Sequence, residues 1–370
     1  MTNTRPQRPW DVPLKDQGHD PSAMRGVLQG WLMAKVPGAR DLRISPVERP
    51  SGNGVSNETV LFDATWEGGG RRLVGRLQTD DPLYLDASVE RQYQMYASLA
   101  AAPGVPVPEM IGFEPDPSVL GTPFFVMERV AGLVPADNPH WTREGWVVDA
   151  SPAQRETLWR SAVERLVALH AVDTAPFSFL SRPADGRHGL EQDLTYWRRS
   201  YRWAAGGQVH PVMEAGEAWL VENLPPAPAP GLSWGDSRPE NMIFEDFRCT
   251  ALLDFESASL AGPSVDLAWW ALMDKGSARL SGLGSPQQTV DLYRQLGGDP
   301  LHDLRYGLVL CAFRLAAIYL RLAAQLEARG LLTEHNRDLG RHSEKLQQLA
   351  LLLEVPAPCP VTATLPALDV

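Results

Sequence analysis

The sequence predicts an α+β protein with a small β-rich N-terminal part and a larger, mainly helical C-terminal part. Up to about residue 130, short runs rich in Thr, Val and aromatic residues alternate apolar with polar side chains, which is typical of strands. From Ser151 onward the apolar residues recur with a period of about 3.6, which indicates amphipathic helices. We find no internal repeat, so the pattern predicts two different lobes.

Four segments follow from these changes of pattern. Residues 1–40 are expected to form a polar tail and one helix, and residues 41–132 a five-stranded sheet with an inserted helix. Residues 133–355 are expected to form the helical lobe, and residues 356–370 a C-terminal tail. Since the first residues include no apolar stretch of the signal-peptide type, we expect a cytoplasmic protein.

The N-terminal part combines helix and strand signals. Met24, Leu28 and Leu32 recur at helical spacing. Ser88 is a candidate N-cap for a second helix that runs to about Ala101. Strands are predicted near residues 42–44, 59–66, 72–78, 110–114 and 123–130.

The C-terminal part opens with a clear helix start at Ser151, where Pro152 occupies the first turn and Gln154 completes a capping box. Further helices are predicted near residues 194–203, 306–329 and 333–355, the last one capped by Thr333, with short strands near residues 242–244 and 251–253. The apolar run 306–320 is interrupted by Arg314 and is shorter than the roughly 18 residues that a membrane span needs. We therefore expect no membrane association.

Composition narrows the classes of partner. A formal net charge of −11 disfavours binding along a nucleic-acid backbone, so no nucleic-acid partner is expected. The cysteines are far apart in the sequence and have no His at ligand spacing, which argues against a disulfide framework or a zinc site. They are Cys249, Cys311 and Cys359.

The strongest chemical signal lies between residues 232 and 256. Asn241 follows Asp236 by five positions, and Asp254 closes a short apolar strand before Phe255, a spacing found in phosphoryl-transfer enzymes. That chemistry needs a carboxylate to accept the hydroxyl proton and oxygen atoms to hold magnesium. The alternative is purely structural, with Asp236 in a turn, Asn241 as a cap and Asp254 at a strand end.

Glu256 adds a further carboxylate to Asp236 and Asp254. If they were brought to about 4 Å, each pair would repel by roughly 4 kcal/mol at an effective dielectric near 20. Such a cluster beside apolar strands predicts a divalent cation.

These motifs resemble the aminoglycoside phosphotransferase and choline kinase family, which are small-molecule kinases with a protein-kinase-like fold. Asp236, Arg238 and Asn241 fall on the family loop H-G-D-x-R-x-x-N, and residues 254–256 fall on its D-x-E element. Residues 262–268 are similar to its G-x-x-x-D-L-A segment, in which the Asp is mainly structural. Over about residues 42–350 the chain is most similar to the branch of kinase-like domains attached to some acyl-CoA dehydrogenases.

This resemblance implies a two-lobed fold that binds ATP and Mg²⁺ between the lobes and transfers phosphate to a hydroxyl group of a small molecule. Asp236 would be the catalytic base, with Arg238 beside it in the same loop. The backbone of the hinge, residues 124–132 and especially Glu128 and Val130, would meet the adenine ring. The ligands of Mg²⁺ would be Asn241, Asp254 and Glu256.

The resemblance also implies phosphate-binding residues in the N-terminal lobe. Arg76 stands where protein kinases have a Lys, and a guanidinium can hold phosphate oxygens in pairs. Its acidic partner would be Glu90, with Gln92 as the alternative. A loop one strand earlier would cover the phosphates with its N–H groups, although a plain hairpin turn is the alternative. The loop residues are Gly52, Asn53, Gly54, Ser56 and Asn57.

Trp234 stands where the family has His, which leaves the base in place but puts the packing of its loop in question. Together with Arg76 it motivates a second hypothesis, a nucleotide-binding pseudokinase without transfer activity. A kinase that acts on proteins is disfavoured, because only a short connection separates Asp254 from Asp266. Among small-molecule acceptors, the dehydrogenase-linked branch suggests hydroxyacyl compounds.

Three further features, namely His170, Arg314 and the helix near residues 196–203, could have a structural role. His170 ends an apolar helical face and is expected to be a core residue bonded to backbone. Arg314 in an apolar helix must be paired, either between helices or toward the substrate. The aromatic and basic helix near residues 196–203 either packs its rings inward or forms a wall of the acceptor site.

Overall fold

The computed structural model describes residues 19–368 apart from 51–56, 227, 229 and 334–337. The chain divides into two compact units. The first takes its described residues from 1–97, 108–130 and 322–339, and the second from 98–107, 131–321 and 340–370. The finer domain bounds given above remain predictions.

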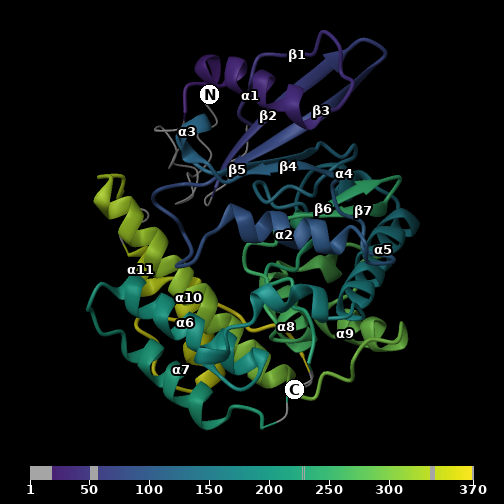
Figure 1. Cartoon of the computed structure of the whole chain (residues 1–370). Helices are drawn as coiled ribbons and strands as arrows, with labels where there is room; N and C mark the ends of the chain where they lie inside the picture. The colour runs from purple at the N-terminus through teal and green to yellow at the C-terminus, as the bar shows by residue number, and fades with distance from the viewer. Residues whose placement is uncertain (1–18, 51–56, 227, 229, 334–337, 369–370) are drawn as a thin grey trace, which may run out of the picture. The chain divides into compact units, whose positions relative to one another are not determined.

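The first unit is built on a five-stranded antiparallel sheet with the strand order β1-β2-β3-β5-β4 (Figure 1). Its strands are β1 (Arg43–Ile44), β2 (Glu58–Trp66), β3 (Gly69–Leu77), β4 (Met110–Glu114) and β5 (Phe124–Glu128). Alternate residues of β2, namely Val60, Phe62 and Ala64, are buried in one core, as the period of two predicts. The predicted sheet is confirmed.

Helix α1 (Pro21–Lys35) packs on this sheet, because its apolar stripe shares the core with the strands. Leu28 and Leu32 are fully buried there, and the ring of Trp31 lies 5.1 Å from that of Phe124. Two more helices belong to this part of the chain, α2 (Val89–Leu99) and the short α3 (Pro117–Leu120). Helix α3 was not predicted from the sequence.

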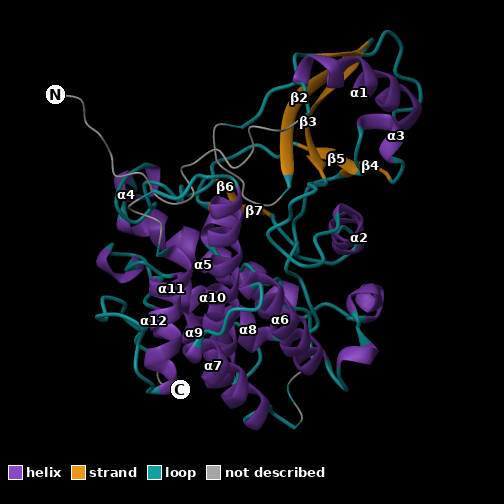
Figure 2. Cartoon of the chain, turned by 90° about the vertical axis from the view of Figure 1, so that its left-hand side faces the viewer, coloured by secondary structure: helices purple, strands orange, loops and turns teal. Residues whose placement is uncertain are grey.

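The second unit is mainly helical, with one small hairpin (Figure 2). Its α-helices are α4 (Trp146–Asp149), α5 (Pro152–His170), α6 (Gly189–Ala205), α7 (Pro211–Glu222), α8 (Pro263–Met273), α9 (Pro286–Gln295), α10 (Leu304–Ala328), α11 (Leu339–His342) and α12 (Glu344–Leu353). The last turns of α10 and the first residue of α11 belong to the first unit. Short 3₁₀ turns span Ala175–Leu180, Pro183–Asp185, Pro239–Asn241 and Ser277–Arg279. The hairpin consists of β6 (Met242–Glu245) and β7 (Arg248–Leu252).

The hairpin is fixed against the long helix α5. Ser161 on α5 accepts a hydrogen bond of 2.8 Å from the backbone N–H of Cys249 on β7. Helix α5 begins as predicted, since Ser151 caps it and Gln154 completes the capping box. The predicted strands of this region are therefore held beside a predicted helix.

Helix α10 is long and apolar enough, by length and composition, to cross a membrane, which corrects the shorter run estimated from sequence. However, 72% of its most apolar window is buried inside the protein. Burial in the protein accounts for this apolar composition without a bilayer.

The single helix predicted over residues 333–355 is wrong in its described part. Ser343 adopts an extended conformation and its hydroxyl accepts from the N–H of Leu346, so a new helix begins there. Helix α12 consequently starts at Glu344, and Thr333 is not its cap.

Candidate active site

The loop that carries Asp236 is anchored to the chain segment that follows β7. The backbones of Ser233 and Ser259 exchange two hydrogen bonds, of 2.8 and 3.0 Å. Gly235 has a positive φ of 91°, and a Cβ atom there would lie 2.2 Å from the carbonyl oxygen of Ser257. Only glycine therefore allows the loop to approach this closely immediately before Asp236.

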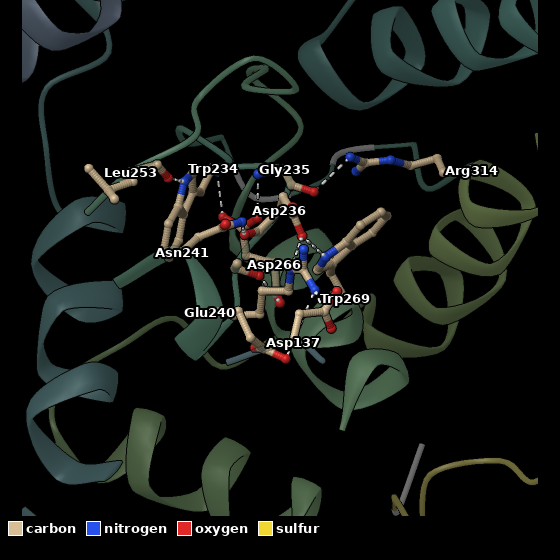
Figure 3. A network of polar contacts seen from close by, with 12 residues as sticks. Asp137, Trp234, Gly235, Asp236, Glu240, Asn241, Leu253, Asp266, Trp269 and Arg314 are labelled. Atoms are coloured by element: carbon tan, nitrogen blue, oxygen red, sulfur yellow. Dashed lines mark hydrogen bonds and ion pairs between the residues drawn. The ribbon is translucent and has the colours of Figure 1, made fainter. Parts of the chain in front are cut away.

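Asp266, in the first turn of α8, is fully buried and accepts hydrogen bonds from the loop that carries Asp236 (Figure 3). Its Oδ1 accepts from the N–H of Gly235 at 2.8 Å and from the hydroxyl of Ser233 at 3.0 Å. Its Oδ2 accepts from the N–H of Trp234 at 2.6 Å. These donors compensate the burial of the carboxylate and fix the backbone on which Asp236 stands.

His170 contributes to the same network, which corrects the expected bond to backbone. Its Nε2 lies 2.9 Å from Oδ2 of Asp266, and its Nδ1 lies 2.9 Å from the hydroxyl of Tyr293. The side chain is buried, as predicted, but its partners are side chains. His170 therefore joins α5, α8 and α9 behind the loop.

The carboxylate of Asp236 is held through one oxygen (Figure 3). The indole N–H of Trp269 donates to Oδ1 at 2.7 Å. Nε of Arg238 forms an ion pair with the same oxygen at 3.0 Å. The side chain of Asp236 keeps 16% of its exposed area, so the group is oriented without being sealed off.

Arg314, on α10, is fully buried and contacts the loop immediately before Asp236. Its Nη2 donates to the carbonyl of Gly235 at 2.9 Å. Its guanidinium carbon lies 4.8 Å from the ring centre of Trp197 and 4.9 Å from that of Trp269, distances typical of cation–π contacts. Of the two alternatives for Arg314, the contacts are those of a bridge between α6, α8 and the loop.

Trp234 connects the loop to the segment after β7 that contains Asp254. It is fully buried, and its indole N–H donates to the carbonyl of Leu253 at 2.8 Å. Its ring lies 5.6 Å from that of Phe255. Trp234, which stands where the family has His, thus fits into the core. Its contacts with Leu253 and Phe255 link the loop that carries Asp236 to the segment around Asp254.

Asn241 and Asp254 are brought to neighbouring positions by the hairpin. The carbonyl of Asn241 accepts from the N–H of Leu253 at 2.9 Å, immediately before Asp254. The side-chain nitrogen of Asn241 donates to the carbonyl of Asp236 at 2.9 Å, which turns its amide oxygen the other way. An amide oxygen and a carboxylate are hard oxygen donors of the kind that Mg²⁺ prefers, so these two residues fit that ion.

The expected cluster of Asp236, Asp254 and Glu256 does not form as a group. Among the residues that the structure describes, no three His, Cys, Asp or Glu side chains gather as metal ligands do. The reason is that Asp236 turns to Trp269 and Arg238. Glu256 is half-buried two positions beyond Asp254, and its role as a ligand remains a prediction.

Arg238 belongs to a charged network that extends away from Asp236. Its Nη1 lies 3.5 Å from Asp137 and 3.9 Å from Glu240, and Glu240 lies 3.1 Å from Nε2 of His140. Burial would lower the pKa of Arg238, but the charges of Asp236, Glu240 and Asp137 outweigh it and raise that pKa. Arg238 therefore stays cationic beside Asp236.

Candidate residues in the first unit lie on strand β3 and helix α2. Arg76 on β3 lies opposite Thr59 and donates to its hydroxyl at 2.8 Å. Glu90 is exposed in the first turn of α2, whereas Gln92 is buried. The pairing of Arg76 with Glu90 remains a prediction.

The hinge and the loop are described only in part. The N–H of Glu128 donates to the carbonyl of Glu109 at 2.8 Å, which fixes the end of β5 two residues before Val130. Asn57 is fully buried where β2 begins. Gly52, Asn53, Gly54 and Ser56 lie outside the described residues.

The aromatic and basic helix α6 turns its rings inward. Trp197 and Tyr201 are buried, and the arginines on its outer side are engaged by carboxylates. The ion pairs are Arg198–Glu217 at 2.9 Å, Arg199–Asp185 at 2.8 Å, and Arg202 with Glu214 at 3.1 Å and Glu217 at 2.8 Å. The packing alternative is the one that these contacts support.

The roles of Trp269, His140 and Asp137 were not predicted from the sequence. A signal for Trp269 exists, because it follows Asp266 by three positions on a helix and therefore faces the same side. His140 and Asp137 come from a segment about a hundred residues before Arg238, and no local pattern connects them.

Comparison with known proteins gives the wider context. Residues 47–284 match the family described as the phosphotransferase enzyme family. The Gallus gallus protein named acyl-CoA dehydrogenase family member 11 is 32% identical over 250 residues, which cover 66% of this chain and 30% of that protein. The chain thus spans about a third of the length of such a relative, and the predicted similarity to dehydrogenase-linked domains is confirmed.

Solved structures share the fold. A Ralstonia eutropha protein assigned to the aminoglycoside phosphotransferases superposes with a TM-score of 0.67 at 24% identity, covering 89% of this chain and 98% of that one. Aminoglycoside phosphotransferase APH(4)-Ia, in a ternary complex with AMP-PNP and hygromycin B, gives a TM-score of 0.51 at 16% identity, covering 88% and 98%. The predicted α+β, kinase-like fold is confirmed.

Proposed function

The chain belongs to the phosphotransferase enzyme family, and on that basis we propose that it transfers the γ-phosphoryl group of ATP to a hydroxyl group of a small molecule. The observation that carries the proposal is that the carboxylate of Asp236 is held in place and partly exposed. Its Oδ1 is held by Trp269 and Arg238, while its side chain keeps some exposure. A fixed, accessible carboxylate is the group that accepts a hydroxyl proton in this chemistry.

In the proposed reaction the acceptor oxygen attacks the γ-phosphorus as the bond to the bridging oxygen of ADP breaks. The hydroxyl proton passes to Asp236. Asn241 and Asp254, with Glu256 as a further candidate, would hold Mg²⁺, which when bound neutralises charge on the phosphate oxygens. Arg238 steadies the carboxylate in its ionised form.

Nucleotide binding is supported by the bound AMP-PNP in the APH(4)-Ia complex. In the present chain we assign the phosphates to Arg76 and to the loop formed by Gly52, Asn53, Gly54, Ser56 and Asn57. The adenine would meet the backbone near Glu128 and Val130. Arg76 suits this task because a guanidinium presents paired donors to phosphate oxygens.

The acceptor is proposed to be a small hydroxylated molecule. APH(4)-Ia holds hygromycin B, whereas the Gallus gallus relative is an acyl-CoA dehydrogenase family member. Because of the similarity to the acyl-CoA dehydrogenase family member, hydroxyacyl compounds should be tested as acceptors in addition to aminoglycosides.

A pseudokinase that binds nucleotide without transfer is the second candidate. It was suggested by Trp234 and Arg76. Since Trp234 still links the loop to Leu253, its presence does not disfavour the enzyme.

The test is ADP release from ATP and Mg²⁺ over a panel of hydroxylated metabolites, hydroxyacyl compounds and aminoglycosides. For an acceptor that is turned over, Asp236→Asn should lower kcat by roughly 10²-fold to 10⁴-fold, the range for loss of a general base. Nucleotide affinity should stay nearly unchanged. Turnover within a factor of about two of wild type would show that Asp236 is not the base.

A further inference from the structure

One contact of the proposed base comes from a residue outside the loop and metal motifs. Trp269 lies on α8, is buried, and donates its indole N–H to Oδ1 of Asp236 at 2.7 Å (Figure 3). A hydrogen bond to a carboxylate at this distance is short and charge-assisted. The indole is itself fixed, since Arg314 stacks on its ring and donates to the carbonyl of Gly235.

The ion pair with Arg238 would pull the carboxylate in another direction if it acted alone. Arg238 approaches Oδ1 through Nε at 3.0 Å, while its Nη1 faces Asp137 and Glu240. Guanidinium and carboxylate groups commonly pair through two parallel contacts. Without Trp269, Asp236 is free to rotate and bring both oxygens onto Arg238.

We propose that Trp269 is a positioning residue for Asp236, which keeps Oδ1 on the protein side and presents Oδ2 to the acceptor hydroxyl. This inference rests on the proposed function, because it assigns a task to the proposed base. Removing the indole N–H should therefore affect the chemical step more than the binding of ATP.

Three substitutions separate the donor from the bulk of the ring. Trp269→Phe keeps a six-membered ring without a donor. Trp269→His removes more bulk, but its five-membered ring places Nε2 where the indole has Nε1. The matched control is Trp219→Phe, because Trp219 lies on α7 with its ring 6.1 Å from that of Tyr306, and the contacts given above for Asp236 and Arg238 involve neither residue.

With an acceptor that is turned over, Trp269→Phe should lower kcat by roughly 10- to 100-fold, as expected for a lost hydrogen bond to a charged group, and leave KM for ATP within about twofold. Trp269→His should restore much of kcat. Trp219→Phe should stay within about threefold of wild type. If Trp269→His were worse than Trp269→Phe, bulk rather than the donor would matter, and the proposal would be overturned.

A second measurement needs no substrate and so separates this inference from the proposed function. In the ¹H–¹⁵N spectrum of the full chain, Trp269→Phe identifies the indole signal of Trp269 by its loss. Asp236→Ala should then move that signal upfield, because a donor to a carboxylate loses its acceptor, and should leave the other indole signals of the twelve Trp residues near their places. An unmoved signal would overturn the inference. Wild-type protein that transfers no phosphate to any acceptor, with the signal moved as expected, would instead contradict the proposed function alone.

Discussion

Asp236 and Asp266 are two carboxylates of one network with different surroundings. Asp266 is fully buried and both its oxygens accept hydrogen bonds from the loop. Asp236 keeps partial exposure, and its contacts fall on Oδ1. The first therefore holds the loop in shape, whereas the second is suited to meet a substrate.

The metal assignment is tested at Asp254. Asp254→Ala should abolish the part of ATP binding that depends on Mg²⁺, because a carboxylate ligand of the ion is lost. Calorimetric titration of ATP with and without Mg²⁺ measures this. Asp246→Asn, at an exposed turn between β6 and β7, is the control and should keep the full Mg²⁺ dependence. Equal Mg²⁺ dependence in Asp254→Ala and wild type would refute the assignment.

Residues that lie close together in the sequence were the ones that could be predicted. Asp236, Asn241 and Asp254 carry a fixed spacing that chemistry explains, and the hairpin brings the last two together. The partners of Arg314 could not be predicted, because Asp193, Trp197 and Gly235 meet it only in the folded chain. Their positions depend on how α6, α8 and α10 pack.

At the scale of elements, the approach of the loop to residue 257 depends on Gly235. Gly235→Ala should lower the free energy of unfolding by roughly 2–3 kcal/mol, because it adds a strained φ and a clash with the carbonyl of Ser257. Denaturant unfolding followed by circular dichroism measures this change.

The matched control is Gly206, which also has a positive φ but no neighbour within 4 Å of a Cβ atom. Gly206→Ala should cost only about 1 kcal/mol, the price of the left-handed conformation alone. Equal losses in the two variants would mean that the close approach to Ser257 contributes nothing to stability.

Helix starts show where sequence patterns succeed and where they fail. The cap Ser151, with Gln154, fixes α5 because its hydrogen bonds are local. The pattern over residues 333–355 is apolar enough for one helix, yet Ser343 begins a new one at Glu344. An internal cap of this kind competes with helix continuation, and periodicity alone does not decide between them.

At the scale of the whole molecule, Glu58 makes stability depend on pH. Its carboxylate, on the first residue of β2, lies 2.9 Å from Nδ1 of His19 and 3.0 Å from Nη2 of Arg49. Burial would raise the pKa of Glu58, but the hydrogen bonds from His19 and Arg49 outweigh it and hold that pKa below its ordinary value of 4.5. The unfolded chain therefore binds the proton more readily than the folded one.

It follows that the stabilisation from Glu58 is complete above about pH 4.5 and is lost as the pH falls through the lowered pKa. Unfolding free energies of wild type and Glu58→Gln should differ most near neutral pH and converge in acid. Glu245→Gln, an exposed substitution on β6, is the control and should follow wild type. A difference between wild type and Glu58→Gln that stays constant down to about pH 3 would contradict this explanation.

The fold class was predictable because strand and helix periods change sharply between the two parts of the chain. The sheet order β1-β2-β3-β5-β4 was not, since β4 pairs with β5 at the edge of the described sheet and follows the inserted helix α2 in the sequence. The residues that complete the candidate site, such as Trp269, likewise depend on packing between distant segments.

The central claim is transfer of phosphate to a hydroxyl group, and ³¹P nuclear magnetic resonance of the reaction mixture tests it most directly. With ATP, Mg²⁺ and a hydroxylated acceptor, wild-type protein should convert the γ-phosphate signal into that of a phosphate ester, at a rate that Asp236→Asn reduces strongly. Inorganic phosphate formed with ADP but without any phosphate ester, or an ester formed equally fast by Asp236→Asn, would contradict the account.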